Sequence, residues 1–317
     1  MLRINSHRAY LLMATLLPNQ SIKCTTTPAS RVCSTGASAA YSGTFELAHK
    51  FQTSPDSWVL RFNLPDGRKH LGNDPMLPTC ISVRYNGTSE KGEEKVLKKS
   101  YSPISHPSVD GFFDLLVKGY EIRPGGGVGT YLNSLKVGQQ IEAGLKAERM
   151  MHGSTVVSRR WKRIGLVAGG TGVAPLIQII RICLENPTDQ TRIQLLSINR
   201  REEDILFRTE LDRLASDHPD RFSVTYSLTS ETRPGSFEGE AGRGTVEMVR
   251  QNLPPPAGGD GSTMIFVCGM DGFVATWGGP VGRAPPKADG TKGPKIQGPL
   301  EGLLKEAGFD ESEVFKY

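Results

Sequence analysis

The chain lacks the cysteine patterns that hold zinc sites and small secreted domains together. Its 317 residues contain five cysteines, and none of these shows the close paired spacing of a metal or redox motif. The six histidines have no ligand spacing either. We therefore predict neither a metal site nor a disulfide framework, and a reducing compartment fits this cysteine usage better.

Long hydrophobic runs are also missing. The apolar stretch Ala9–Leu17 is shorter than the roughly 20 residues that a helix needs to cross a bilayer. No other segment is long and apolar enough, so any membrane association is expected only through the N-terminal residues.

Acidic residues are absent from the first 45 positions, where Arg3, Arg8, Lys23 and Arg31 precede the first acid, Glu46. Such a basic, Ser/Thr-rich start is typical of a mitochondrial transit peptide. We therefore expect residues 1–45 to be a targeting or disordered leader and the protein to be mitochondrial. A secretory signal and a cytoplasmic or membrane-surface leader are the alternatives.

The rest of the chain carries almost no net charge, because residues 46–317 contain 34 basic and 33 acidic side chains. It has no dense basic stripe with interleaved aromatic residues, which argues against nucleic-acid binding. With 37% hydrophobic and 22% charged residues, the composition is that of a soluble globular protein, and the length favours two domains.

The first predicted domain, residues 46–155, reads as a series of short strands separated by Gly, Pro and Asp turns. Strands at this spacing indicate an antiparallel barrel or sandwich. The expected strands are 58–62, 79–85, 112–118 and 140–143, with one helix at 131–135.

The second predicted domain, residues 164–317, alternates strands with helices, which is typical of a doubly wound parallel sheet. The basic stretch 145–163 is the expected linker, and the Gly- and Pro-rich stretch 278–298 an inserted surface loop. The expected strands are 164–168, 193–198, 222–227 and 264–268, and the expected helices 175–185, 207–216, 244–252 and 299–307.

A glycine turn in the second domain is the most informative motif. The apolar run Ile164–Ala168 leads into Gly169, Gly170, Thr171 and Gly172 and then into a helical segment. A strand, a glycine turn and a helix in this order point backbone N–H groups at an anion, although an ordinary tight turn is the alternative. A second apolar strand, Met264–Cys268, ends in the pair Cys268-Gly269. Two such strand ends can form the place where α/β sheets bind dinucleotides.

The first domain holds its own candidates. Lys99, Tyr101 and Ser102 stand at a strand end, and the run Pro124-Gly-Gly-Gly-Val-Gly-Thr-Tyr131 precedes the predicted helix. A cation and a tyrosine two residues apart share one face of a strand, and the glycine run offers a second anion site.

Taken in order, these motifs resemble the NADH-cytochrome b5 reductase family of the ferredoxin–NADP+ reductase-like flavoproteins. The similarity extends over 46–317. It includes the basic-x-Tyr-Ser strand, the glycine run, the Gly-Gly-Thr-Gly-x-x-Pro turn, the Cys-Gly pair and the aromatic C-terminus. The resemblance implies an antiparallel β-barrel FAD domain, followed by a Rossmann-like parallel α/β domain that binds NAD(P)H.

The resemblance also implies roles for individual residues. Thr171 and Cys268 are the expected catalytic residues, Thr171 facing the flavin and Cys268 pressing the nicotinamide against it. The residues expected to bind FAD are Lys99, Tyr101, Ser102, Leu116, Lys118, Gly126, Gly127, Val128 and Gly129. Those expected to shape the nicotinamide nucleotide site are Gly169, Gly170, Thr171, Gly172, Pro175, Cys268 and Gly269.

The implied function is an FAD-dependent oxidoreductase that passes a hydride from NADH to FAD and then single electrons to cytochrome b5 or a similar heme carrier. Three departures keep other interpretations open. Lys99 replaces the family's arginine, Gly129 replaces its serine, and Thr229 stands where NADH-preferring members carry an acid. An NADPH-using reductase with another acceptor and a flavin-free scaffold therefore remain alternatives. Arg200, Arg201 and Arg233 are candidates for contact with the adenosine ribose.

Overall fold

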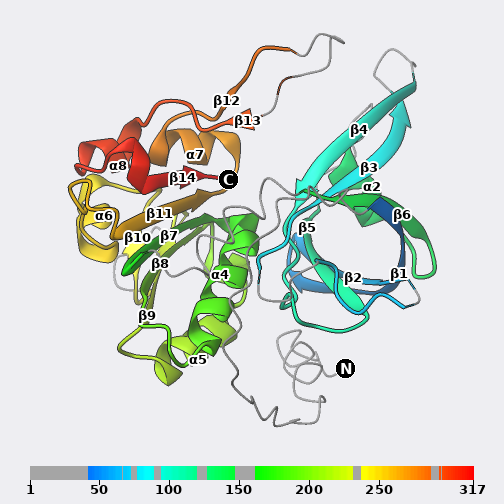
Figure 1. The fold of residues 1–317 in the computed structure, drawn as a ribbon, viewed down its shortest axis with the longest axis horizontal. Helices are drawn as coiled ribbons and strands as arrows, with labels where there is room; N and C mark the ends of the chain where they lie inside the picture. The colour runs from blue at the N-terminus through cyan, green and yellow to red at the C-terminus, as the bar shows by residue number, and fades with distance from the viewer. Residues whose placement is uncertain are drawn as a thin grey trace, which may run out of the picture.

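A computed structural model describes residues 42–65, 67–72, 77–88, 94–119, 127–146, 161–230, 237–286, 293 and 295–317. These residues form two domains side by side, an antiparallel sheet in the first and a parallel sheet in the second (Figure 1). Residues 1–41 of the expected leader and most of the expected linker, with Gly126 and Arg233, lie outside the described residues.

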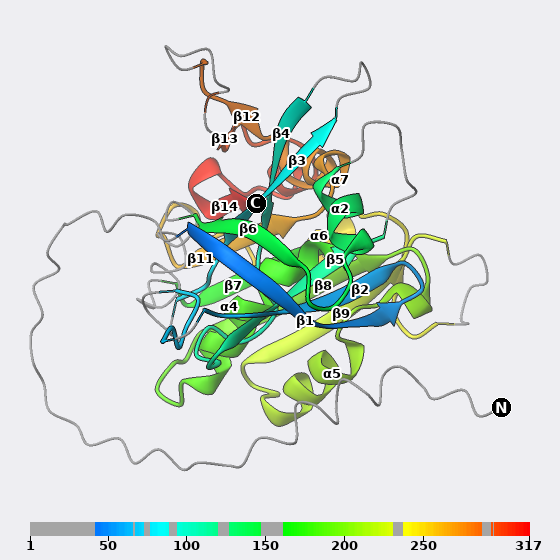
Figure 2. The same ribbon diagram turned by 90° about the vertical axis from the view of Figure 1, so that its right-hand side faces the viewer.

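The first domain is built from antiparallel pairings only, in the strand order β4-β3-β6-β1-β2-β5. Just after β4, Pro103 forms a bridge to Leu115 of β5, so the two edges of the sheet meet and the predicted barrel is confirmed (Figure 2). Its elements are β1 (Ser42–Ser54), β2 (Ser57–Asn63), β3 (Ile81–Thr88), β4 (Glu94–Tyr101), β5 (Phe112–Lys118), helix α2 (Val128–Ser134) and β6 (Gln140–Leu145).

The barrel is filled by the apolar side chains that alternate along its strands, including Leu60, Phe62, Phe113 and Leu115. Phe45 is 1% exposed in this core. Strand β1 therefore begins inside the stretch that the sequence assigned to the leader, since the apolar residue that anchors it precedes the first acid.

The second domain has parallel pairings in the order β10-β9-β8-β7-β11-β14, which confirms the Rossmann-like prediction. Its strands are β7 (Arg163–Gly169), β8 (Arg192–Asn199), β9 (Phe222–Leu228), β10 (Glu240–Ala241), β11 (Thr263–Cys268) and β14 (Val314–Lys316). Its helices are η1 (Gly170–Gly172), α4 (Val173–Glu185), η2 (Glu202–Asp204), α5 (Arg208–Asp217), α6 (Val246–Asn252), α7 (Asp271–Gly278), α8 (Gly302–Glu306) and η3 (Glu311–Glu313).

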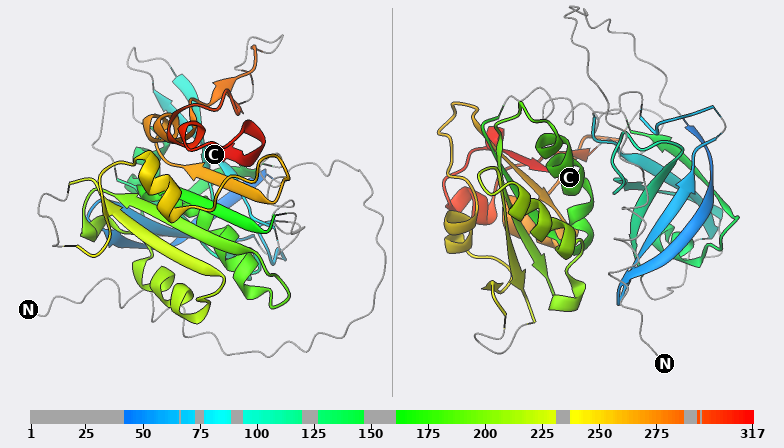
Figure 3. Two further views of the ribbon diagram at one scale, coloured as in Figure 1. Left: turned by 90° about the vertical axis from the view of Figure 1, so that its left-hand side faces the viewer. Right: turned by 90° about the horizontal axis from the view of Figure 1, so that it is seen from below.

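Helices cover both faces of this sheet (Figure 3). Successive strand residues point to opposite faces, so Leu166 packs with α4 and α5 while Val167 packs with α6, α7 and α8. The strands are buried on both sides, which explains why they read as continuous apolar runs rather than as alternating ones.

The inserted stretch 278–298 leaves the sheet after α7 and contains a two-stranded hairpin of β12 (Gly282–Arg283) and β13 (Lys295–Ile296). Lys316 of β14 holds the two ends of this stretch together, because its buried ammonium donates to Gly278 O at 3.0 Å and to Pro299 O at 2.8 Å. Burial lowers the pKa of Lys316.

Helix α4 lies between the parallel sheet and the barrel (Figure 1). The core of the second domain includes Val59, Ile104 and Leu116 of the barrel, so the two domains share a packed apolar boundary. Within the described part of the chain, no helix combines the length and the hydropathy needed to span a membrane.

Candidate active site

The glycine turn after β7 is held against the end of β11 by backbone contact. A Cβ placed on Gly172 would lie 2.1 Å from the carbonyl oxygen of Cys268. Since only glycine allows this approach, the turn that carries half-buried Thr171 lies directly beside Cys268. Strands β7 and β11 are also neighbours in the sheet, with Ala168 opposite Cys268. The structure thus brings the two predicted catalytic residues to one edge of the sheet.

The other glycines of the two motifs have structural reasons of their own. Gly170 has a φ of +53°, in the left-handed region that side chains disfavour. The ring of Phe273 in α7 lies where a Cβ on Gly169 or on Gly269 would stand, at 2.9 Å and 2.5 Å. Phe273 therefore fixes both loops, a role that the sequence did not reveal.

The same turn also meets the barrel, because η1 contacts β5. Near the end of that strand, Leu116 is 4% exposed and packs with the core of the second domain rather than with the barrel core. Pro175 is buried in the first turn of α4, where its missing N–H costs no helix hydrogen bond. The predicted nicotinamide residues and the β5 residues predicted to contact FAD therefore adjoin one another across the domain boundary.

The predicted flavin strand β4 presents Lys99 and Tyr101 together, with the Lys99 ammonium 5.5 Å from the centre of the Tyr101 ring. Tyr101 packs against the barrel core, and Ser102 is half-buried just beyond the strand. Although Lys99 is exposed, desolvation lowers its pKa, and the negative charge of Asp271 opposes this shift. Asp271 is the first residue of α7, whose N-cap is Met270, and no side-chain hydrogen bond caps this helix.

Helix α2 begins within the glycine run, directly after Gly127. Gly127, which precedes it, has extended backbone and open space where a Cβ would stand, and no side chain caps the first turn. Val128 and Gly129 are buried at the helix start, and α2 contacts both β4 and β5. These features fit a phosphate-bearing group such as FAD, because amide donors without a side-chain cap adjoin the strands that carry Lys99 and Lys118.

Lys118 has a partner that the sequence did not suggest. Its ammonium lies 2.8 Å from Oδ2 of Asp56, in the turn between β1 and β2, and Arg200 of the second domain lies 2.5 Å from the same oxygen. Burial raises the pKa of Asp56, but the hydrogen bond and charge of Lys118, with Ser57 and Arg200, lower it overall. Arg200, predicted to contact an adenosine ribose, is thus paired across the domain boundary.

Helix α4 carries two further residues that sequence reasoning missed. The side chain of fully buried Gln178 accepts a hydrogen bond from Thr79 N at 2.7 Å and donates to Pro103 O at 2.5 Å. One turn further on, Arg181 donates to Ile104 O and forms a bidentate pair with Glu210 at 2.7 Å. The available signal was a polar pair three residues apart within the apolar helix run 173–184.

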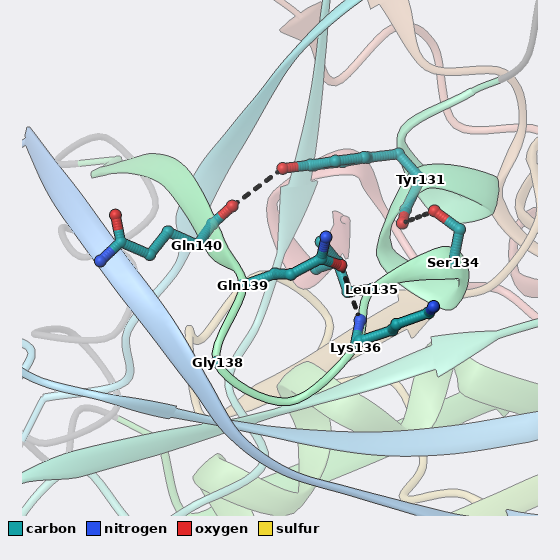
Figure 4. Close-up of a pocket in the computed structure, with 7 residues that line it drawn as sticks. All are labelled: Tyr131, Ser134, Leu135, Lys136, Gly138, Gln139 and Gln140. Atoms are coloured by element: carbon teal, nitrogen blue, oxygen red, sulfur yellow. Dashed lines mark hydrogen bonds between the residues drawn. The ribbon is translucent and has the colours of Figure 1, made fainter.

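A hollow of about 540 Å³ lies elsewhere, in the turn between α2 and β6 (Figure 4). Its polar groups already bond one another: Tyr131 donates to Gln140 O at 3.0 Å, and Lys136 N donates to Gln139 at 2.8 Å. None of the predicted catalytic residues lines it. Among the described residues, no group of three or more His, Cys, Asp or Glu side chains is arranged to hold a metal ion.

Two family models match the chain, one for each domain. The oxidoreductase FAD-binding domain matches residues 44–145, and the oxidoreductase NAD-binding domain matches residues 166–277. The chain therefore carries an FAD domain and an NAD domain in the predicted order.

Similar proteins point to one family. NADH-cytochrome b5 reductase 2 of Mycosarcoma maydis is 34% identical over 83% of this chain and 68% of its own length. An NADH-cytochrome b5 reductase-like protein of Arabidopsis thaliana is 32% identical over 90% of both chains. The cytochrome b5 reductase domain of Ulva prolifera nitrate reductase superposes with a TM-score of 0.65 at 26% identity, over 87% of this chain and 97% of that one. The chain belongs to the NADH-cytochrome b5 reductase family.

Proposed function

We propose that this protein oxidises NADH with bound FAD and passes single electrons to cytochrome b5 or a similar small heme carrier. When bound, FAD supplies the conversion between a two-electron hydride donor and a one-electron acceptor. One observation carries the proposal: the turn of Thr171 lies against both Cys268 and β5. This juxtaposition joins the predicted nicotinamide residues to the predicted flavin residues.

The protein's own contribution is binding and orientation. Lys99 supplies a positive charge, and the uncapped start of α2 supplies amide donors, for the phosphates of FAD. The turn at Gly170–Gly172 and the pair Cys268-Gly269 place backbone and small side chains where a nicotinamide ring must approach closely. Phe273 and the buried boundary around Leu116 hold these segments in place and exclude water from the contact.

The test is anaerobic mixing of the purified protein with NADH, followed by oxidised cytochrome b5. We expect the protein to be yellow, the flavin absorbance to bleach on mixing, and cytochrome b5 to be reduced afterwards. Colourless protein that takes up no added FAD would support the flavin-free scaffold. Bleaching without transfer to cytochrome b5 would support a reductase with another acceptor.

Cys268→Ala tests the orienting role within the same experiment. We expect slower flavin reduction at saturating NADH with little change in melting temperature, because Cys268 is half-buried at the end of β11. Cys80→Ala is the matched control, since it removes the same thiol group from a buried position in the barrel domain. Equal reduction rates for Cys268→Ala and the wild type would contradict the role.

We also propose that the N-terminal residues direct the protein to mitochondria. The proposal is supported by four basic residues and no acid before Glu46. Residues 1–41 fused to a fluorescent reporter should carry it to mitochondria, and a variant with the four basic residues changed to glutamine should not. A reporter that stays cytosolic or is secreted would contradict this.

A further inference from the structure

Arg200 directly follows the carboxyl end of β8. The pairing of β8 with β9 continues beyond both strands: Thr229 N donates to Asn199 O and Ser230 N donates to Arg200 O, each at 2.9 Å. Arg200 is thus fixed beside the end of β9. In doubly wound domains, ligands bind at this edge of the sheet, and an arginine near the adenosine ribose accommodates a 2′-phosphate.

Taken alone, this position favours the phosphorylated coenzyme. The side chain of Arg200 is 59% exposed, so a ligand can reach it, and its planar set of donors suits phosphate. The neighbouring strand β9 is followed by Thr229, a neutral residue, so this position places no carboxylate beside the ribose.

The structure gives Arg200 a carboxylate from the other domain instead. Nη2 of Arg200 lies 2.5 Å from Oδ2 of Asp56, whereas its contacts with Asp204 are longer, at 3.4 Å. Asp56 is held in place by Lys118, 2.8 Å from the same oxygen, and by the barrel turn between β1 and β2. Asp56 therefore reaches the arginine as a prepositioned partner.

The charges of this cluster balance. Lys118 and Arg200 contribute two positive charges, and Asp56 and Asp204 two negative ones. A dianionic 2′-phosphate approaching Arg200 meets a neutral cluster and must displace the Asp56 carboxylate from its closest contact. Without Asp56 the cluster has a net positive charge, and Nη2 of Arg200 loses that closest partner.

We propose that Asp56 selects the coenzyme from across the domain boundary, by occupying the Arg200 guanidinium that a 2′-phosphate would otherwise bind. The inference rests on the proposed function, since it assumes that the second domain binds NADH at this edge. It makes a barrel residue a determinant of specificity for the other domain. Neither Asp56 nor Arg200 needs to contact NADH itself.

The test compares binding of adenosine 2′,5′-bisphosphate (2′,5′-ADP) with binding of 5′-AMP to the FAD-loaded protein by calorimetry. The two nucleotides differ only in the 2′-phosphate, and the measurement does not depend on turnover. We expect Asp56→Asn to improve the affinity ratio in favour of 2′,5′-ADP by about tenfold, the scale of one exposed charge-assisted phosphate contact. The gain should shrink in high salt, because the contact is exposed.

Two further variants make the result specific. Arg200→Gln added to Asp56→Asn should return the ratio to the wild-type value, because the guanidinium that gains the phosphate is gone. Asp110→Asn is the matched control, because it also removes one negative charge from the barrel. Asp110 precedes β5, whereas Asp56 pairs with Lys118 at the other end of that strand. The side chain of Asp110 is 68% exposed beside His70. This variant should leave the ratio within about twofold of wild type, since distant exposed charges are screened.

An unchanged ratio in Asp56→Asn, with normal 5′-AMP binding, would overturn the inference and leave the proposed function standing. A gain that persists in the double variant would also overturn it, because the effect would not pass through Arg200. Failure of the wild type to bind 5′-AMP or NADH would overturn both proposals.

Discussion

Replacing Gln178 with methionine removes the polar clamp between α4 and the barrel while keeping the side-chain volume. Gln178 Oε1 accepts from Thr79 N at 2.7 Å, and Nε2 donates to Thr79 O at 3.1 Å and to Pro103 O at 2.5 Å. Both partner residues are buried, as is Gln178. The variant leaves three buried backbone groups without this partner.

The expected cost follows from these three groups. A buried donor or acceptor that loses its partner costs about 1–3 kcal/mol, so three of them predict a loss of about 3 kcal/mol or more in the free energy of unfolding. The clamp also fixes α4, which begins directly after the Thr171 turn, to Pro103, two residues beyond Tyr101. Small displacements of reacting groups slow reactions steeply, so we expect flavin reduction by NADH to slow about tenfold.

Urea unfolding and anaerobic stopped-flow reduction of the flavin measure the two effects. Gln251→Met is the matched control, since Gln251 is exposed on α6 and bonds only Glu247 among the contacts described, so its stability should stay within about 0.5 kcal/mol of wild type. If Gln178→Met unfolds at the wild-type urea concentration and its flavin is reduced at the wild-type rate, the clamp neither stabilises the domain boundary nor positions α4.

Three other perturbations test the site and its surroundings. Gly172→Ala should lower stability by about 3 kcal/mol, because its Cβ would lie 2.1 Å from a backbone oxygen of Cys268, whereas Gly272→Ala meets nothing within 4 Å and should be neutral in thermal unfolding. Lys99→Ala should weaken FAD binding about tenfold in reconstitution of the apoprotein, since a charge-assisted phosphate contact is lost; unchanged affinity would make Lys99 a surface residue only. Burial, with the charge of Arg181, lowers the pKa of His106 from 6.5 to about 4. Between these pH values, His106 is therefore protonated in the unfolded state but neutral in the folded state. The free energy of unfolding should therefore decrease as the pH falls from 6.5 towards 4, by no more than about 1.4 kcal/mol per pH unit. Urea unfolding of His106→Gln should show a weaker pH dependence. An identical slope in that variant would exclude His106 as the source of the pH dependence.

Local patterns in the sequence determined much of this protein. Apolar runs bounded by Gly, Pro and charged residues predicted four of the six strands of the parallel sheet, β7, β8, β9 and β11, within one residue at each end. Strands buried on both faces are continuously apolar, whereas the short strands β10 and β14 were not predicted. The glycine turn and the Cys-Gly pair were also recognisable from the sequence alone. Their chemistry depends on small residues at fixed places along a short segment, such as Gly170 with its positive φ.

The tertiary structure alone decided which of these segments work together. Asp56 and Arg200 are 144 residues apart, and Gln178 bonds Thr79 across 99 residues. The neighbouring sequence does not show which residue pairs with which. Lys118 likewise pairs with Asp56, where the motif alone suggested contact with FAD. Ion pairs and buried hydrogen bonds depend on the distance and burial created when two domains pack, and these quantities do not exist until the chain has folded.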